Sequence, residues 1–81
     1  MAGCSALCGM RKMSVQRRLS RNIQRIRRDK GMSQEEVAHL AAVHQTYLSG
    51  VETARRNPSV KVIERIANAL GVDVVELFKA N

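Results

Sequence analysis

The sequence predicts an all-α domain built from five short helices. Apolar residues recur at intervals of three and four, helix-capping residues and glycines bound most of these stretches, and no stretch alternates as a strand does. Only Tyr47 and Phe78 are aromatic, so the core has to be built from aliphatic side chains. At 81 residues the chain is near the size at which one apolar core is only marginally sufficient, and a partner chain would add stability.

The first predicted helix covers about residues 14–30. Its apolar stripe has spacings of four, four and three residues and consists of Val15, Leu19, Ile23 and Ile26. A row of arginines falls on the other side of the helix: Arg18, Arg21, Arg25 and Arg28. Gly31 is expected to end the helix in a left-handed conformation.

Two shorter helices follow. Ser33 and Glu36 have the spacing of a capping box, which predicts the start of a helix. Its inward positions are Val37, Ala38 and Ala41. After a break at Ala42 and Val43, a helix over about residues 45–53 is predicted. Its inward positions are Leu48 and Val51.

A loop over residues 54–58 separates these helices from the last two, because Pro58 disfavours helix at the residue before it. Ser59 is the expected cap of the fourth helix, which ends at Gly71. The apolar face of that helix is Val60, Ile63, Ile66, Ala67 and Leu70. Asp73 is expected to cap a final short helix, whose apolar residues are Val74, Val75, Leu77 and Phe78.

The chain is strongly basic, with a formal net charge of +7 and a sequence pI of about 10.5. Residues 11–30 hold nine arginine and lysine side chains against one acid, Asp29, whereas the rest is close to neutral. Such a cluster favours a polyanionic partner, since it gains affinity by releasing counterions from nucleic acid. A solvated helix face is the alternative, so charge alone does not decide the function.

Residues 1–13 are interpreted as a leader that is not essential to the domain over residues 14–81. Cys4 and Cys8 lie in it without a nearby cluster of histidines or acids, so we predict no metal site and no cofactor. No stretch is apolar enough for a membrane span or a secretory signal, and a cytoplasmic location is expected. No feature indicates a small-molecule substrate.

The order of polar, apolar and capping residues resembles the lambda-repressor/Cro-like, or Xre-type, helix-turn-helix family. The segments that carry the resemblance are SQEEVA at 33–38, Val43, YLSGVE at 47–52, RNPS at 56–59 and IANALGV at 66–72. Together they cover about residues 16–78, and agreement over five helices is far more specific than any one segment. Residues 46–52 are also similar to the controller proteins of restriction-modification operons.

The resemblance implies which residues contact double-stranded DNA. It places Gln34, at the start of the second helix, against phosphate, although a plain first-turn residue is the alternative. It places Gln45, Thr46 and Ser49 where the family reads base edges, with solvent-facing residues as the alternative. Further implied contacts are a phosphate for Tyr47, whose alternative is core packing, and phosphates for Arg55 and Arg56, whose alternative is a solvated loop pair.

Relatives in the family also pair an arginine and a glutamate across the first and third helices, which implies an ion pair between Arg27 and Glu52. Three positions depart from the family pattern. Ala42 stands where glycine usually supplies a left-handed residue, and His44 replaces a better N-cap. Gly50 stands where many relatives present a base-reading side chain.

The function predicted from these features is a sequence-specific transcriptional regulator that binds a pseudo-palindromic operator as a homodimer. The dimer contact is predicted at Val74, Val75, Leu77 and Phe78, because so short a helix cannot bury all of them within one chain. The alternatives are an antitoxin or protein-binding adaptor with the same helices, or a fragment of a nucleic-acid enzyme. No catalytic residue is predicted, since His39 and His44 have no acid or nucleophile at a plausible spacing.

Overall fold

Five helices follow one another along residues 14–80, the part of the chain that the computed structural model describes. They are α2 (Val15–Asp29), α3 (Gln34–Ala41), α4 (Gln45–Glu52), α5 (Val60–Leu70) and α6 (Val74–Phe78). No strand occurs among these residues, so the all-α prediction is confirmed. The predicted leader, with Cys4 and Cys8, lies outside the described residues. No helix within the described range is long and apolar enough to cross a membrane.

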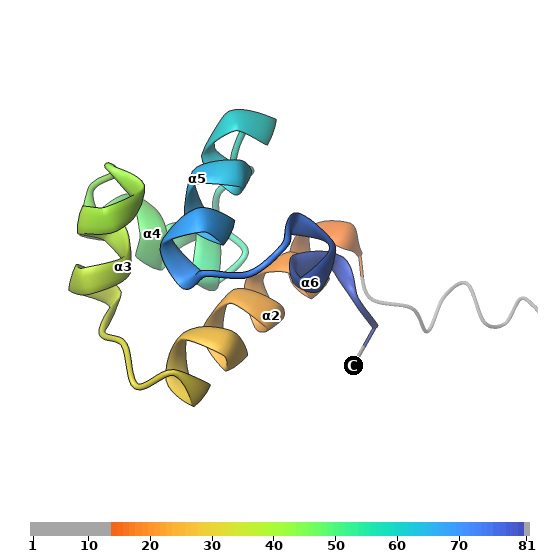
Figure 1. Ribbon diagram of the computed structural model, residues 1–81. Coiled ribbons are helices and arrows are strands. Elements are labelled where there is room, and N and C mark those ends of the chain that lie inside the picture. The colour runs from red at the N-terminus through yellow and green to blue at the C-terminus, as the bar shows by residue number, and fades with distance from the viewer. Residues whose placement is uncertain (1–13, 81) are drawn as a thin grey trace, which may run out of the picture.

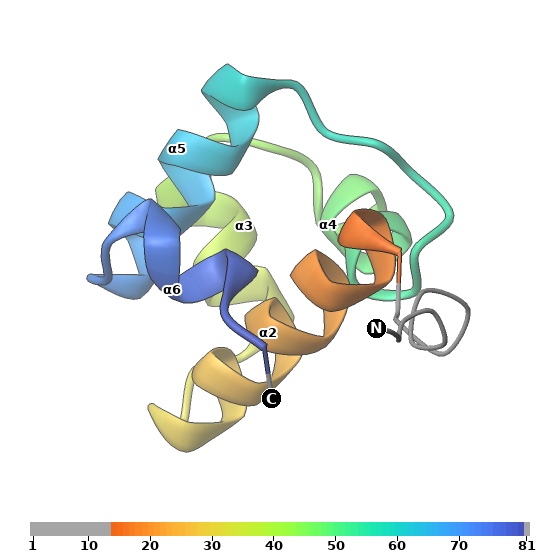
Figure 2. The same ribbon diagram turned by 90° about the vertical axis from the view of Figure 1, so that its right-hand side faces the viewer.

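The helices surround one core of aliphatic side chains. α3 packs mainly against α5, while α2 packs against both α4 and α6 (Figures 1 and 2). The largest side chains that are fully buried in this core are Ile23, Leu48, Ile66, Leu70 and Leu77. α2, α3, α4 and α5 contribute to the core at the predicted spacing, which confirms the periodicity for the central turns of these four helices.

The first turns of α2 and α5 depart from the predicted stripes. Val15 is 65% exposed and Val60 is 82% exposed, so assigning them to the apolar faces was wrong. Side chains on a helix lean toward its N-terminus, so those of the first turn extend away from the rest of the helix, and here they reach solvent. A periodic pattern in the sequence carries no information about where the neighbouring helix ends.

Local capping explains where most helices begin and end. Ser14, Ser33, Ser59 and Asp73 each accept a hydrogen bond from a backbone amide in the first turn. The capping box of Ser33 and Glu36 is complete, which confirms that prediction. Gly31 has a φ of 68°, as predicted; its amide donates to the Arg28 carbonyl at 3.0 Å and the next amide donates to the Arg27 carbonyl.

Two alanines adopt the left-handed conformation that glycine usually supplies. Ala42 has a φ of 59° at the end of α3, and Ala54 has a φ of 60° after α4. Each such alanine is strained by about 1–2 kcal/mol relative to ordinary helical backbone. Side chains support both turns: Arg65 Nε donates to the Ala41 carbonyl at 3.0 Å, and Gln16 Nε2 donates to the Ala54 carbonyl at 2.8 Å.

α6 closes the core of the single chain. Leu77 is fully buried in the monomer, so the prediction that it belongs to a dimer interface was wrong. The amide of Asn22, which is also fully buried, donates to the carbonyls of Leu77 at 2.8 Å and Lys79 at 2.9 Å. These bonds satisfy carbonyls at the end of α6 and tie this helix to α2. Val75 is 61% exposed and Val74 lies at the surface with it.

Candidate nucleic-acid interface

α3 and α4 form two short helices joined by a tight turn. The turn consists of Ala42, Val43 and His44, and Val43 donates its amide to the Ala38 carbonyl at 2.9 Å. His44 makes no side-chain capping hydrogen bond, as expected for a poorer N-cap. The first amides of α4 therefore keep hydrogen-bonding capacity at the protein surface.

The outer face of α4 is polar. Gln45 and Thr46 are exposed, and Ser49 is partly exposed one turn later. The opposite face carries Leu48 and Val51, which are buried in the core. The helix thus holds its polar side chains outward on a rigid support, and the three residues predicted to read base edges lie on one surface.

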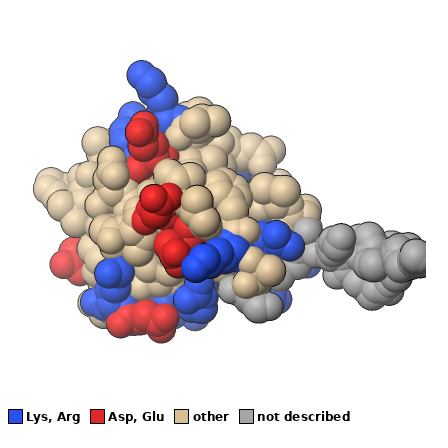
Figure 3. All heavy atoms as spheres, turned by 45° about the vertical axis from the view of Figure 1, so that its right-hand side comes forward, with Lys and Arg blue, Asp and Glu red and all other residues tan. Residues whose placement is uncertain are grey.

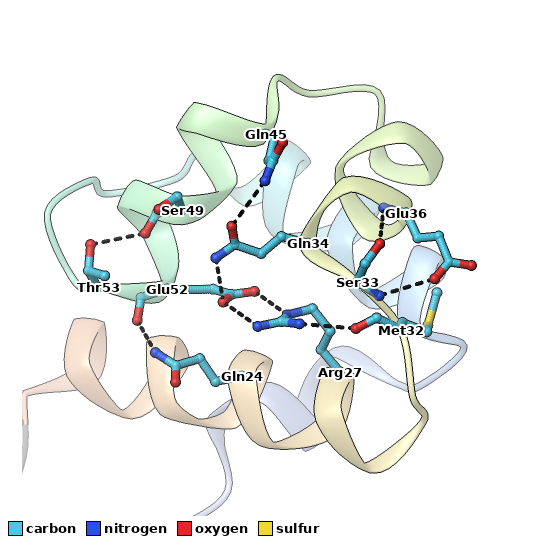
Figure 4. A network of polar contacts seen from close by, with 10 residues as sticks. All are labelled: Gln24, Arg27, Met32, Ser33, Gln34, Glu36, Gln45, Ser49, Glu52 and Thr53. Carbon is cyan, nitrogen blue, oxygen red and sulfur yellow. Dashed lines mark hydrogen bonds and ion pairs between the residues drawn. The ribbon is translucent and has the colours of Figure 1, made fainter.

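A buried ion pair joins α2 to α4. Arg27 Nε lies 2.7 Å from Glu52 Oε2, and Arg27 Nη2 lies 3.0 Å from Glu52 Oε1, so the contact is bidentate (Figure 4). The side chains are 12% and 2% exposed, respectively. Arg27 Nη1 also donates to the Met32 carbonyl at 3.0 Å, just before α3. The predicted pair is therefore present and ties α2 and α4 to the segment that enters α3.

Gln34 extends this network toward the surface. Its Nε2 donates to Glu52 Oε1 at 3.0 Å, and its Oε1 accepts a long contact from Gln45 Nε2 at 3.5 Å (Figure 4). The amide predicted to contact phosphate is thus directed toward a buried carboxylate. Gln34 links Glu52 to the first residue of α4, which gives its side chain a positioning role within the protein.

Arg56 occupies the space beside Gly50. A Cβ atom built on Gly50 would lie 2.6 Å from Arg56 Cγ, closer than real Cβ contacts allow. The Arg56 amide donates to the Gly50 carbonyl at 3.1 Å, so backbone and side chain both follow the end of α4. The glycine that lacks a base-reading side chain therefore leaves room for an arginine from the loop. Arg55, its neighbour, is exposed.

Tyr47 is half-buried and packs against the core. This placement favours the core-packing interpretation of its ring over a wholly surface role. No hydrogen bond of its hydroxyl group is present among the described residues.

Several polar residues that position the interface were not predicted. Gln24 Nε2 donates to the Glu52 carbonyl at 2.6 Å, and Gln16 and Asn22 anchor the ends of α4 and α6. A signal existed for Asn22, because it lies three residues after Leu19 and four before Ile26, within the apolar stripe. The partners of Gln16 and Gln24 could not be inferred, since helical spacing does not show which loop carbonyl lies opposite.

The charged side chains on one face of the protein are of both signs. On the face in Figure 3, acidic and basic side chains lie next to one another and much of the area is uncharged. Two exposed ion pairs also bring opposite charges together: Arg25 lies 3.8 Å from Asp29, and Lys79 lies 3.1 Å from Glu76. The polar face of α4 and the loop after it carry no acidic side chain that is exposed.

Two capped helices joined by a tight turn, with the second held polar face outward by a buried ion pair, define a lambda-repressor/Cro-like helix-turn-helix protein. The chain belongs to the helix-turn-helix family, whose model matches residues 23–77.

Known relatives are regulators of this class. An HTH-type transcriptional regulator of Sinorhizobium fredii is 45% identical over 65 residues, which are 80% of this chain and 84% of the relative. The restriction-modification controller protein C.AhdI of Aeromonas hydrophila has a similar structure, with a TM-score of 0.76 and 35% identity over 78% of this chain and 96% of that one. The C.Esp1396I tetramer in complex with its natural 35 base-pair operator has a TM-score of 0.75 and 36% identity, covering 83% and 88% of the two chains.

We expect Glu52→Gln to lower the free energy of unfolding by about 3 to 5 kcal/mol, because it leaves the Arg27 charge buried without a counter-charge. The melting temperature, followed by circular dichroism, should fall by more than about 10 °C. The matched control is Asp29→Asn, which breaks the exposed pair with Arg25 and should change stability by less than about 1 kcal/mol. A Glu52→Gln protein that melts within about a degree of the wild type would contradict the role assigned to the pair.

Proposed function

We propose that this protein is a transcriptional regulator that binds double-stranded DNA sequence-specifically, with α4 in the major groove. The observation that carries the proposal is the polar outer face of α4, locked in place by the Arg27–Glu52 pair and Gln34. A major groove of about 12 Å width accepts one helix of about that diameter. The operator complex of the structurally similar C.Esp1396I supports the proposal.

The residues divide by the part of DNA that each can recognise. Gln45 can pair with adenine through two hydrogen bonds, and Thr46 offers a hydroxyl and a methyl group that suits thymine. Arg55 and Arg56 contact phosphates, which carry no sequence information. The amides at the start of α3 add a favourable site for phosphate, while the Gln34 side chain lies 3.5 Å from Gln45 Nε2.

The regulator acts as a homodimer, with the exposed surface of α6 in the contact. Val74 and Val75 are exposed on this helix and Phe78 is half-buried, while Leu77 belongs to the core. A two-fold dimer would place two α4 helices about 34 Å apart, so that they meet successive major grooves on one face of a pseudo-palindrome. The oligomeric state of C.Esp1396I on its operator supports an assembly of this kind.

The alternative function, an antitoxin or protein-binding adaptor, is not favoured by the relatives, which are named as transcriptional regulators and control proteins. We also propose that the chain has no catalytic activity of its own. Incubation with DNA and magnesium, followed by gel analysis, tests the absence of catalytic activity, and cleaved products would contradict it.

Selection of duplexes from a random library by the wild-type protein should enrich one pseudo-palindromic sequence. Gln45→Ala should then lose about 1 to 3 kcal/mol of discrimination at one base pair in each half-site, because it removes a base contact. Arg55→Ala is the control and should weaken all sequences alike, since it contacts phosphate. Competition binding with single-base variants of the selected duplex measures both. A wild-type protein that enriches no sequence would refute the proposed function.

Gly50→Ala should weaken DNA binding without lowering the stability of the fold. Alanine in a helix interior is more stable than glycine by about 0.5 to 1 kcal/mol, but its Cβ displaces Arg56 from the face of α4. We expect weaker DNA binding from a protein that melts no lower than the wild type. If Arg56 carries the effect, Gly50→Ala should add nothing further to Arg56→Ala in a double-mutant cycle. Additive losses of DNA affinity in the double variant would show that the glycine acts in another way than through Arg56.

Val75→Asp should convert the dimer into a folded monomer, because a carboxylate would be buried in the proposed contact without a partner. An acidic residue in the first turn of a helix does not disturb the helix itself. The matched control is Val15→Asp, which changes another valine that is 65% exposed in a first turn, on α2. Sedimentation at micromolar concentration checks the outcome, and a wild type that sediments as a monomer on and off DNA would contradict it.

A further inference from the structure

Four arginines form one exposed row along α2. Arg17, Arg21, Arg25 and Arg28 follow one another at spacings of four, four and three residues, and all four are exposed. The periodicity of the sequence predicts Arg18 in this row, but Arg18 is half-buried and Arg17 takes its place. Among residues 14–80 only Arg25 of this row has an acidic side chain within ion-pair distance, namely Asp29. The row therefore carries positive charge that the described part of the chain does not neutralise.

The two halves of this row have different surroundings. Arg17 and Arg21 line a shallow hollow of about 230 Å³ together with Thr53 and Ala54, which follow the last turn of α4. Thr53 also lines the groove of about 410 Å³ that runs along the outer face of α4. The base-reading face of α4 thus continues into a basic surface on α2. Arg25 and Arg28 line another hollow, which Arg21 shares and which includes Asp29 but no residue of α4.

Hydrogen bonds from two residues of α2, one on each side of Arg17 and Arg21 in the sequence, hold this helix against the end of α4 and the residues that follow it. Gln24 Nε2 donates to the Glu52 carbonyl at 2.6 Å, and Gln16 Nε2 donates to the Ala54 carbonyl at 2.8 Å. Glu52 is 3% exposed and its carboxylate is paired with Arg27, so the hollow presents no free acid. Arg17 and Arg21 therefore stand on a helix that is anchored, at two points, to the helix proposed to enter DNA.

We propose that Arg17 and Arg21 bind backbone phosphates of the DNA strand that borders the groove occupied by α4. A helix with its side chains fills the width of the major groove, so surfaces beside it face the sugar-phosphate backbone. The C-terminal end of α4 carries the negative end of the helix dipole, which disfavours phosphate, and two arginines beside it offset this repulsion. The inference rests on the proposed function and adds a second helix to the DNA-binding surface.

The test uses the full chain and a duplex obtained by selection with the wild-type protein. The double variant Arg17→Gln/Arg21→Gln is compared with Arg28→Gln/Lys30→Gln, which removes the same charge from two exposed residues at the C-terminal end of α2. Affinity is measured over a range of salt concentrations. Arg17→Gln/Arg21→Gln should lower the slope of log K against log salt by about 0.9 for each arginine of each bound protomer. This corresponds to roughly fivefold weaker binding per arginine at ~0.15 M salt.

The control should keep a slope close to that of the wild type, and all variants should melt with it and prefer the same bases. Arg17→Lys/Arg21→Lys should restore the slope, because a phosphate accepts either cation. Ethylation of single phosphates gives a direct readout: a subset of the positions that weaken the wild type, those bound by Arg17 and Arg21, should have no effect on the glutamine variant. Positions bound by Arg55, Arg56 or the start of α3 should weaken both proteins. Equal losses in both glutamine variants, or an unchanged slope in the first, would overturn the proposal. A wild type that selects no sequence would instead refute the proposed function itself.

Discussion

The contact between Arg27 and Glu52 determines how the helices of this protein are held together. One guanidinium group binds the carboxylate of α4 through two nitrogens and the carbonyl that precedes α3 through the third. Three segments far apart in the sequence therefore share one buried charge pair. Because either partner alone would be a buried charge without a counter-charge, the pair favours the arrangement of α2, α3 and α4 in which both are hydrogen-bonded. Gln34 contacts both Glu52 and Gln45, and so connects the buried pair to the first residue of α4.

Charged side chains in this small domain have two separate roles: buried charges orient the helices, and exposed charges are available to bind phosphate. The Arg27 and Glu52 charges are withdrawn from water and orient helices, whereas the arginines of the α2 row and of the loop after α4 remain in water. Exposed arginines contribute little to folding but are free to exchange counterions for phosphates. Gly50 contributes to the exposed set of charges, because the absence of a side chain at this position leaves room for Arg56 on the face of α4.

The turns on either side of α4 are less favourable than the rest of the backbone, and side chains from other helices support them. Ala42 and Ala54 stand in left-handed conformations, and His44 provides no capping bond. Arg65 and Gln16 bind carbonyls at these two turns. The sequence indicated the strain at Ala42, because family members have glycine there. It did not indicate the supporting side chains, because each comes from a distant helix.

The sequence by itself determined the helices, most of their caps and the surface of α4 that faces outward. These features depend on spacings within ten residues or so, such as Ser33 to Glu36 or Leu19 to Ile23, and local physics decides them. Only the tertiary structure decided that Leu77 lies inside the monomer, that Val15 and Val60 lie outside the core, and that Gln34 turns toward Glu52. Each of these outcomes depends on which distant helix lies opposite a given residue, and periodicity along one helix contains no information on its neighbour.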